Sequence, residues 1–284
     1  MSFYRSMALA KHTRPNMFSI ILWELKQRKN AILWWTIGSV ILTVVILFLY
    51  PSIRDQANQL NQVINQLPPG LRDLKTGGSA TVDVADPIQF LNSQLFYATL
   101  PLIWIILAIT RGGSVLGRDE QNHTLELLLS RPISRGNVLL AKALSLCIEF
   151  LVVGGATLIA IVLIAPHFDM HVSTWHLAIA TFYTVAFSLS FGLIAFTLQA
   201  ASSLARKAAV ATAVAIGFGG YLLASLSGLT DWLQTPAKLA PYHYFTPDKI
   251  LHGQPVTGLD IYLIGVLVFA VVISYVGFRR RDIS

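Results

Sequence analysis

Charged side chains are scarce in this sequence: Asp, Glu, Lys and Arg together make up 12% of its 284 residues. Soluble domains carry about 25%, so this chain has too few charges to cover a water-facing surface. Hydrophobic residues make up 54%, and the mean hydropathy is +0.61. These values exclude an ordinary soluble domain and indicate a chain that is solvated largely by lipid.

Cysteine is almost absent as well. The single cysteine, Cys147, lies within an apolar run, so the chain can form no internal disulfide. The net charge of +7 does not indicate a nucleic-acid-binding protein, because the basic residues cluster in short segments between apolar runs. We therefore expect no nucleic-acid partner.

Motifs for nucleotide hydrolysis and other catalysis are also missing. The sequence has no G-x-x-x-x-G-K-[ST] phosphate loop, no H-E-x-x-H and no G-x-S-x-G. Gly112-Gly113-Ser114 and Gly219-Gly220 lack the lysine and the strand context, so we interpret them as flexible span ends and close helix packing. We expect no enzyme activity and no cofactor in this chain.

Long apolar runs, in contrast, are abundant. A membrane-spanning helix needs about 20 apolar residues, because no water satisfies its backbone in the hydrocarbon. We expect six spans, at about residues 31–50, 94–110, 143–165, 177–199, 208–229 and 261–278. The fold class is therefore predicted to be all-α and polytopic, with residues 1–284 forming one transmembrane domain.

The distribution of Lys and Arg predicts the orientation. Of the 21 basic residues, six precede the first span, five lie in 111–142, two at 206–207 and three at 279–281, which leaves five for the opposite side. Positive loops favour the cytoplasm. We predict a multi-pass protein of the cell (cytoplasmic or inner) membrane with both termini in the cytoplasm.

Short helices are expected outside the spans. Residues 16–30 read as an amphipathic helix lying on the inner leaflet, and an extension of the first span is the alternative. The apolar face of this segment carries Phe18, Ile21, Leu22 and Leu25, and its charged face carries Glu24, Lys26, Arg28 and Lys29. On the outer side, Ile53, Leu60, Ile64 and Leu67 form a stripe on a helix that stops at Pro68, after Pro51 ends the first span. The proline-rich segment 230–260 is expected to pack as short helices over the bundle.

Residues 117–142 have the most informative pattern. Leu125, Leu128 and Leu129 lie at i, i+3 and i+4 and form one apolar face. Arg131-Pro132 ends this helix, and Ser134 is placed to cap the helix that continues into the third span. A helix of about two turns is too short to be stable alone. Its leucines are expected either in the groove of a partner protein or on the membrane surface, and the pattern alone favours neither.

The sequence EQNHTLELLLSRPISR at 120–135 resembles the cytoplasmic coupling helix of ABC exporter permeases of the type-2 (ABC-2-like) superfamily. Further matches are Trp23-Glu24, LPPGL at 67–71, the aromatic loop at 241–249 and FRRRDI at 278–283. The resemblance implies a homodimer or pseudo-dimer of permeases and a separate ABC ATPase subunit, which holds ATP and Mg and docks at the coupling helix. The docking residues that it implies are Glu120, Thr124, Leu125, Glu126, Leu128, Leu129, Arg131, Pro132 and Arg135.

The resemblance further implies ATP-driven export, or lateral extraction, of a small hydrophobic or amphipathic substrate such as a drug, peptide or lipid-like molecule. The path would follow the dimer axis between the second and fifth spans, where a face of small residues permits close helix approach. Candidate pathway residues are Phe96, Thr99, Ile103, Phe218, Tyr221, Leu222 and Ser225. Packing within one subunit is the alternative for each of them.

Two other functions stay open. One is a membrane anchor or regulatory subunit that docks an ATPase without passing a substrate. The other is an ATP-independent channel or secondary transporter, which usually carries several intramembrane charges. Glu149 is the one carboxylate that the expected third span offers, roughly 10 Å from its start at 1.5 Å per residue. We expect a structural pairing, with Lys142 as one possible partner, and proton coupling is the alternative.

A group of metal-ligand residue types lies near one outer turn. It consists of His167, Asp169, Met170, His171 and His176. The residues after Pro166 are not expected to be helical, and histidines are common at membrane interfaces. We therefore favour an interfacial cluster over a metal site.

Overall fold

The structure is a computed structural model that describes residues 17–68, 71–72, 83–115, 134–201, 206–229 and 231–280. Within these ranges six helices are long and apolar enough to cross a membrane, and the described residues form no β-strand. The spans are α2 (Met17–Asp55), α6 (Thr99–Val115) with α5 (Pro87–Leu91) and η1 (Asn92–Phe96) before it, α9 (Arg135–Ile164), α10 (Thr174–Ala201), α11 (Arg206–Leu226) and α14 (Thr257–Arg280). The predicted all-α fold and all six predicted spans are confirmed.

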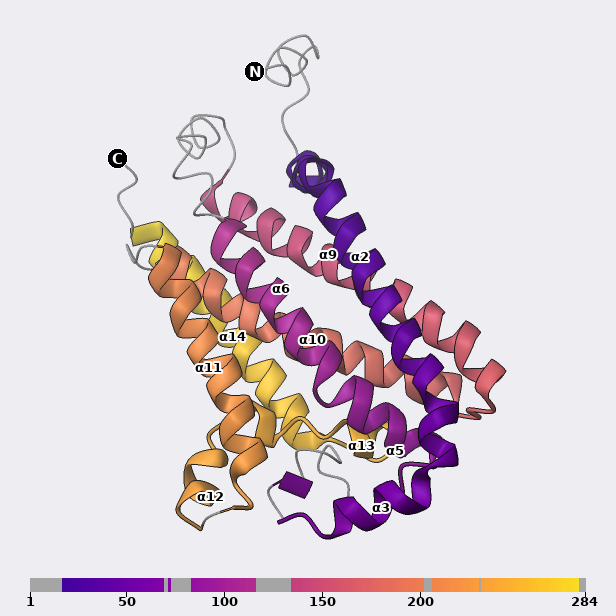
Figure 1. Ribbon diagram of the computed structural model, residues 1–284. Helices are drawn as coiled ribbons and strands as arrows, with labels where there is room; N and C mark the ends of the chain where they lie inside the picture. The colour runs from indigo at the N-terminus through magenta and orange to yellow at the C-terminus, as the bar shows by residue number, and fades with distance from the viewer. Residues whose placement is uncertain are drawn as a thin grey trace.

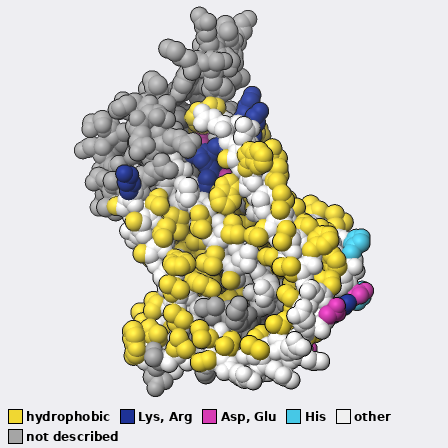
Figure 2. Space-filling model, viewed as in Figure 1, with side chains coloured by type: hydrophobic (Ala, Val, Ile, Leu, Met, Phe, Trp, Pro, Cys, Tyr) yellow, Lys and Arg dark blue, Asp and Glu magenta, His cyan; other side chains and the backbone are white. Residues whose placement is uncertain are grey.

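The chain crosses back and forth through a single bundle. Figure 1 shows that the start of α2, the end of α6, the starts of α9 and α11 and the end of α14 lie at one end of it. Helices α3 (Ala57–Asn65), α12 (Asp231–Ala237) and α13 (Pro247–Leu251) lie at the other end. Hydrophobic side chains cover the middle of the face seen in Figure 2, and Lys and Arg side chains gather mainly toward the end where α2 begins. This distribution suits a bundle that lipid surrounds at its middle.

Helix α2 is longer than expected. It runs without a break from Met17 to Asp55 and contains Pro51, so the expectation that the first span ends at Pro51 is wrong. Figure 1 shows its first turns end-on and the remainder lengthwise, so the helix bends between the two parts. Residues 17–30 are therefore helical and continuous with the first span, which is the alternative expectation, and their position on the inner leaflet stays a prediction. Ile20 and Ile21 are buried against Val138 and Ala141 of α9.

Helix α10 lies at the centre of the bundle. It packs most extensively against α6 and α14 and also contacts α9 and α11. Among the described residues, three hydrogen-bonded pairs join it to α14. The hydroxyl oxygens of Tyr262 and Ser190 lie 3.0 Å apart, Ser274 Oγ donates to Thr197 Oγ1 at 3.2 Å, and the Tyr183 hydroxyl donates to Oδ1 of Asp260 at 2.6 Å. Such polar contacts hold helices together in lipid, where no hydrophobic force drives their association.

The α6–α10 contact depends on two glycines. A Cβ atom on Gly112 would lie 2.0 Å from the carbonyl oxygen of Gly192, and one on Gly192 would lie 2.7 Å from that of Ala108. The backbones therefore touch directly. Close packing is the correct interpretation of Gly112, and the same packing fixes the end of α6 against the centre of the bundle.

Aromatic residues close the opposite end of the bundle. Tyr242 and Phe245, from the loop after α12, are almost fully buried. The ring of Phe187 stacks on that of Phe245 at a centroid distance of 4.3 Å, and Tyr221 meets Tyr242 edge to face at 5.1 Å. Burial raises the pKa of the Tyr242 hydroxyl well above its usual value. The segment 231–251 thus packs as short helices over the bundle, as expected.

Candidate functional site

The candidate site is the end of the bundle where α6 ends and α9 begins. The connecting residues 116–133 lie outside the described ranges, and with them Glu120, Thr124, Leu125, Glu126, Leu128, Leu129, Arg131 and Pro132 of the predicted docking set. Arg135 is the first residue of α9. Ser134 caps this helix as predicted, because its Oγ accepts a hydrogen bond from the backbone N–H of Asn137 at 3.2 Å. The structure therefore fixes the two helices that hold the segment.

A buried ion pair joins these two helices. Nε of Arg111 on α6 donates to Oε1 and Oε2 of Glu149 on α9, at 2.8 and 2.7 Å, and Nη2 also donates to Oε2. Arg111 is 7% exposed and Glu149 is fully buried. A buried charge is costly unless it is paired, and a fork of N–H donors facing a carboxylate is the strong geometry for such a pair. The predicted structural role of Glu149 is supported, with Arg111 as its partner.

A second buried cluster joins α9 to the start of α2. Nζ of Lys142 lies 2.5 Å from Oε1 of Glu24, and Nε of Arg28 lies 3.8 Å from Oε2 of the same carboxylate. Lys142 is fully buried, and Glu24 and Arg28 are 5% and 9% exposed. The expectation that Glu24 and Arg28 lie on the water-facing side of the N-terminal helix is therefore wrong. They face α9, where Lys142 supplies the opposite charge.

Both clusters lie on α9, seven residues apart and thus about two turns along one side of the helix. One ties α9 to α6, which enters the segment 116–133, and the other ties α9 to the N-terminal part of α2. Buried pairs have few alternative partners, so relative movement of the helices would break them at a large cost. A force applied to residues 116–133 would therefore move α6, α9 and the N-terminal part of α2 together.

The predicted pathway residues do not share one surface of the chain. Phe96, Tyr221 and Ser225 are buried, and the hydroxyl oxygens of Tyr97 and Ser225 lie 3.4 Å apart. Ile103 and Thr99 are partly buried in the described bundle. Phe218 and Leu222, in contrast, are 53% and 38% exposed on α11.

Helix α11 has two faces lined by small residues. Ala209, Ala213 and Gly217 face the bundle, and a Cβ on Gly217 would contact Ile105 and Phe191. Ala211 and Ala215 face outward on the same side as Phe218 and Leu222, at helical spacing. This outward stripe of α11 is exposed on the surface of the described chain.

The histidine turn is not assembled as a metal site. Across the described ranges, no three or more His, Cys, Asp or Glu residues are grouped so that they could hold a metal ion. His167 and His171 are exposed, and Asp169 lies 3.4 Å from Nη1 of Arg54 at the end of α2.

Sequence reasoning missed Arg111 as the partner of Glu149 and suggested Lys142 instead, which in the structure pairs with Glu24. Arg111 directly follows the apolar run at 94–110, so it was assigned to the loop, although α6 continues to Val115. Lys142 lies in the sequence VLLAKALSL, and apolar neighbours on both sides are a signal for burial. A lone carboxylate within a span, such as Glu149, also requires a nearby cation.

Six apolar helices, two of which are joined by a buried ion pair and flank residues 116–133, define a multi-pass membrane protein. The family model described as "ABC-2 family transporter protein" matches residues 19–283. The chain therefore belongs to the ABC-2 family and is a membrane permease of the ABC transporter type, whose members function with a separate ATPase subunit. A search of curated proteins gives no match.

Proposed function

We propose that this chain is the permease subunit of an ATP-driven exporter that moves or extracts a hydrophobic or amphipathic substrate. A separate subunit, which holds ATP and Mg, would dock on residues 120–135. The observation that carries the proposal is the Arg111–Glu149 pair, because it joins the two helices between which the docking segment runs. Movement of the ATPase would then be transmitted to two spans at once.

The working unit would contain two permease chains. The support is the outward stripe of Ala211, Ala215, Phe218 and Leu222 on α11, where small residues permit close approach of a second helix. In the proposed dimer the substrate path would follow this contact. Phe218 and Leu222 would then face the path, and Tyr221 and Ser225 would support it from within the subunit.

The proposed orientation places both termini and residues 116–133 in the cytoplasm. The excess of Lys and Arg at the corresponding segments supports it. In a Cys147→Ala background, cysteines at Ser52 and Thr257 should react with an impermeant thiol reagent added to intact cells, whereas one at Ser203 should react after the membrane is permeabilised. Labelling of Ser203 in intact cells would reverse the orientation.

Co-purification followed by reconstitution tests the function. The tagged chain is isolated in mild detergent from its native membranes, and bound proteins are identified by mass spectrometry. We expect a subunit that carries a G-x-x-x-x-G-K-[ST] phosphate loop. In liposomes, amphipathic compounds should stimulate ATP hydrolysis by the complex and move across the membrane with ATP. If an ATPase binds but no compound stimulates its ATP hydrolysis and no compound crosses the membrane, the chain is an anchor or regulatory subunit.

A further inference from the structure

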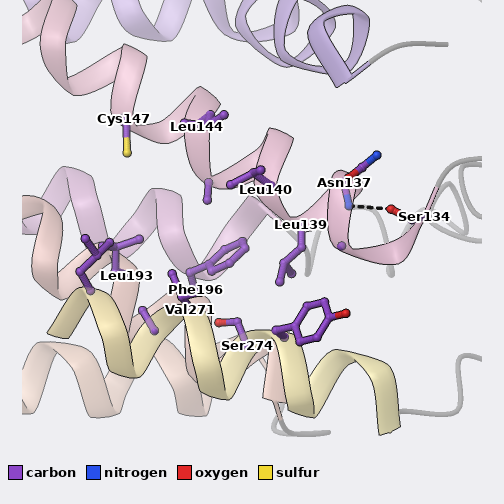
Figure 3. A pocket seen from close by; sticks show the side chains of 15 residues that line it. Ser134, Asn137, Leu139, Leu140, Leu144, Cys147, Leu193, Phe196, Val271 and Ser274 are labelled. Carbon is purple, nitrogen blue, oxygen red and sulfur yellow. Dashed lines mark hydrogen bonds between the residues drawn. The ribbon is translucent and has the colours of Figure 1, made fainter. Parts of the chain in front are cut away.

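An apolar groove runs between α9 and α14, with α10 as its floor (Figure 3). Its volume is about 1020 Å³, at the upper end of the roughly 300–1,000 Å³ of small-molecule sites. Leu139 and Cys147 point from α9 toward α14, and Phe196 of α10 lies between the two helices. The groove is therefore a recess between spans with a mainly hydrophobic lining.

The groove is open along its side. Leu140, Leu267 and Val271 line it and are 50%, 52% and 59% exposed. Because α9 and α14 are membrane-spanning helices, this open side faces lipid. A molecule dissolved in the membrane can enter the groove sideways.

The polarity of the lining changes along its length. Ser134 and Asn137 lie at the end where α9 begins, and Cys147 lies toward the other end (Figure 3). Thirteen residues of helix separate Ser134 from Cys147, or about 20 Å at 1.5 Å per residue. One leaflet contributes about 15 Å of hydrocarbon, half of a core about 30 Å thick. The groove thus matches one leaflet, with its polar end at the interface.

The sequence has arginines at the two helix ends that meet at the polar end of the groove. Helix α9 begins at Arg135, and α14 ends at Arg280, with Arg279 one turn beyond Tyr275 of the groove lining. A Cβ atom on Gly136 would lie 3.3 Å from Cε2 of Tyr275, so the two helix ends meet there. Three arginines therefore belong to the helix turns at this end of the groove.

We infer that the groove binds one anionic phospholipid of the adjoining leaflet, with an acyl chain along the apolar lining and the phosphate at the arginine-bearing helix ends. Basic residues between spans are the usual chemistry for anionic headgroups, and the polar-to-apolar gradient matches a lipid that keeps its orientation in the leaflet. The outward stripe proposed for a second chain lies instead on α11, which packs against α10 and α6. The inference does not depend on the proposed export function.

Native mass spectrometry of the purified chain tests the inference, in detergent micelles that contain either phosphatidylglycerol or phosphatidylcholine with the same acyl chains. Bound phosphatidylglycerol should exceed phosphatidylcholine roughly fivefold or more. Replacement of Arg279 and Arg280 by Gln should lower phosphatidylglycerol binding roughly fivefold per arginine. Val271→Trp, which fills the groove, should lower the binding of both lipids. Ala143→Phe, from the opposite wall, gives the same readout if Val271→Trp does not fold.

Two matched controls are available. Val272 is exposed on α14 outside the groove, so Val272→Trp should leave lipid binding unchanged. The Lys26→Gln, Lys29→Gln double variant removes two exposed charges of α2 and should also leave lipid binding unchanged. Equal binding of the two lipids, or equal effects of Val271→Trp and Val272→Trp, would overturn the inference. A Val271→Trp variant that loses a dimer but keeps its lipid would show an interface between copies instead, which also overturns it.

Discussion

Arg111 and Glu149 form a buried, forked ion pair between α6 and α9. The 37 residues between them include all of 116–133, so the pair joins the two helices on either side of the segment that the docking partner is expected to contact. Both side chains are buried, so neither charge is solvated by water and each is neutralised by the other. The pair therefore holds α6 and α9 at a fixed spacing.

The first prediction concerns this pair. Glu149→Gln should lower the free energy of unfolding by about 3–5 kcal/mol, because it leaves the Arg111 guanidinium buried without its counter-charge. Arg111→Met should lower the free energy of unfolding by a similar amount, because it leaves the Glu149 carboxylate buried without a cation. Combining Arg111→Met with Glu149→Met should recover most of the loss, since a well-packed apolar pair removes both desolvation penalties. Thermal unfolding in detergent, followed by size-exclusion chromatography, measures all three. Additive losses in the double variant would contradict the pairing.

The second prediction concerns the cluster that joins α2 to α9. Glu24→Gln removes the carboxylate from two buried cations at once, whereas Lys142→Met leaves Arg28 beside Glu24. Glu24→Gln should therefore destabilise more, and amide exchange should rise first in residues 17–28. The exposed Lys29 is the control, because Lys29→Met should change stability by less than about 0.5 kcal/mol. Exchange that rises uniformly over the whole chain would argue against a local clamp.

The third prediction tests the α6–α10 contact. Gly192→Ala places a Cβ within 2.7 Å of the Ala108 carbonyl oxygen, so the backbones must separate. Overpacking of this kind costs about 1–3 kcal/mol, and the yield of folded protein should fall. Gly155→Ala is the matched control, because a Cβ there meets nothing within 4 Å. It should be neutral or stabilise by up to about 1 kcal/mol through helix propensity. Equal behaviour of the two variants would place the helix contact elsewhere.

The spans could be predicted from the sequence because lipid imposes a simple requirement of length and apolar content. Each of the six predicted spans lies within or overlaps an observed span helix. Their ends were harder to predict, because a helix continues wherever tertiary contacts satisfy its polar side chains. Helix α2 continues through Pro51 to Asp55, and α6 includes Arg111 because Glu149 neutralises it.

The faces of the helices were less predictable. The expected polar side of residues 16–30 included Glu24 and Arg28, which lie buried because Lys142 is opposite them. Periodicity shows which residues share a face but not what that face meets. The predicted pathway set separated for the same reason: Tyr221 and Ser225 point toward Tyr97, whereas Phe218 and Leu222, on the same helix, point outward. The docking role of residues 120–135, Arg135 included, stays a prediction.

The most direct test of the account is the binding of the ATPase subunit by variants of that segment. Leu125 and Leu128 lie on the predicted apolar face, and Leu127 projects from another side of the helix. Truncating a fully buried leucine to alanine costs about 2–5 kcal/mol, and each 1.4 kcal/mol is tenfold in affinity.

The measurement is pull-down of the ATPase in detergent by the parent chain, by the Leu125→Ala, Leu128→Ala double variant and by Leu127→Ala. The double variant should insert into the membrane normally and bind the ATPase more weakly by orders of magnitude, while Leu127→Ala should bind nearly as the parent does. Equal recovery of the ATPase by all three chains would mean that the leucines rest on lipid, and the docking role of residues 120–135 would be contradicted.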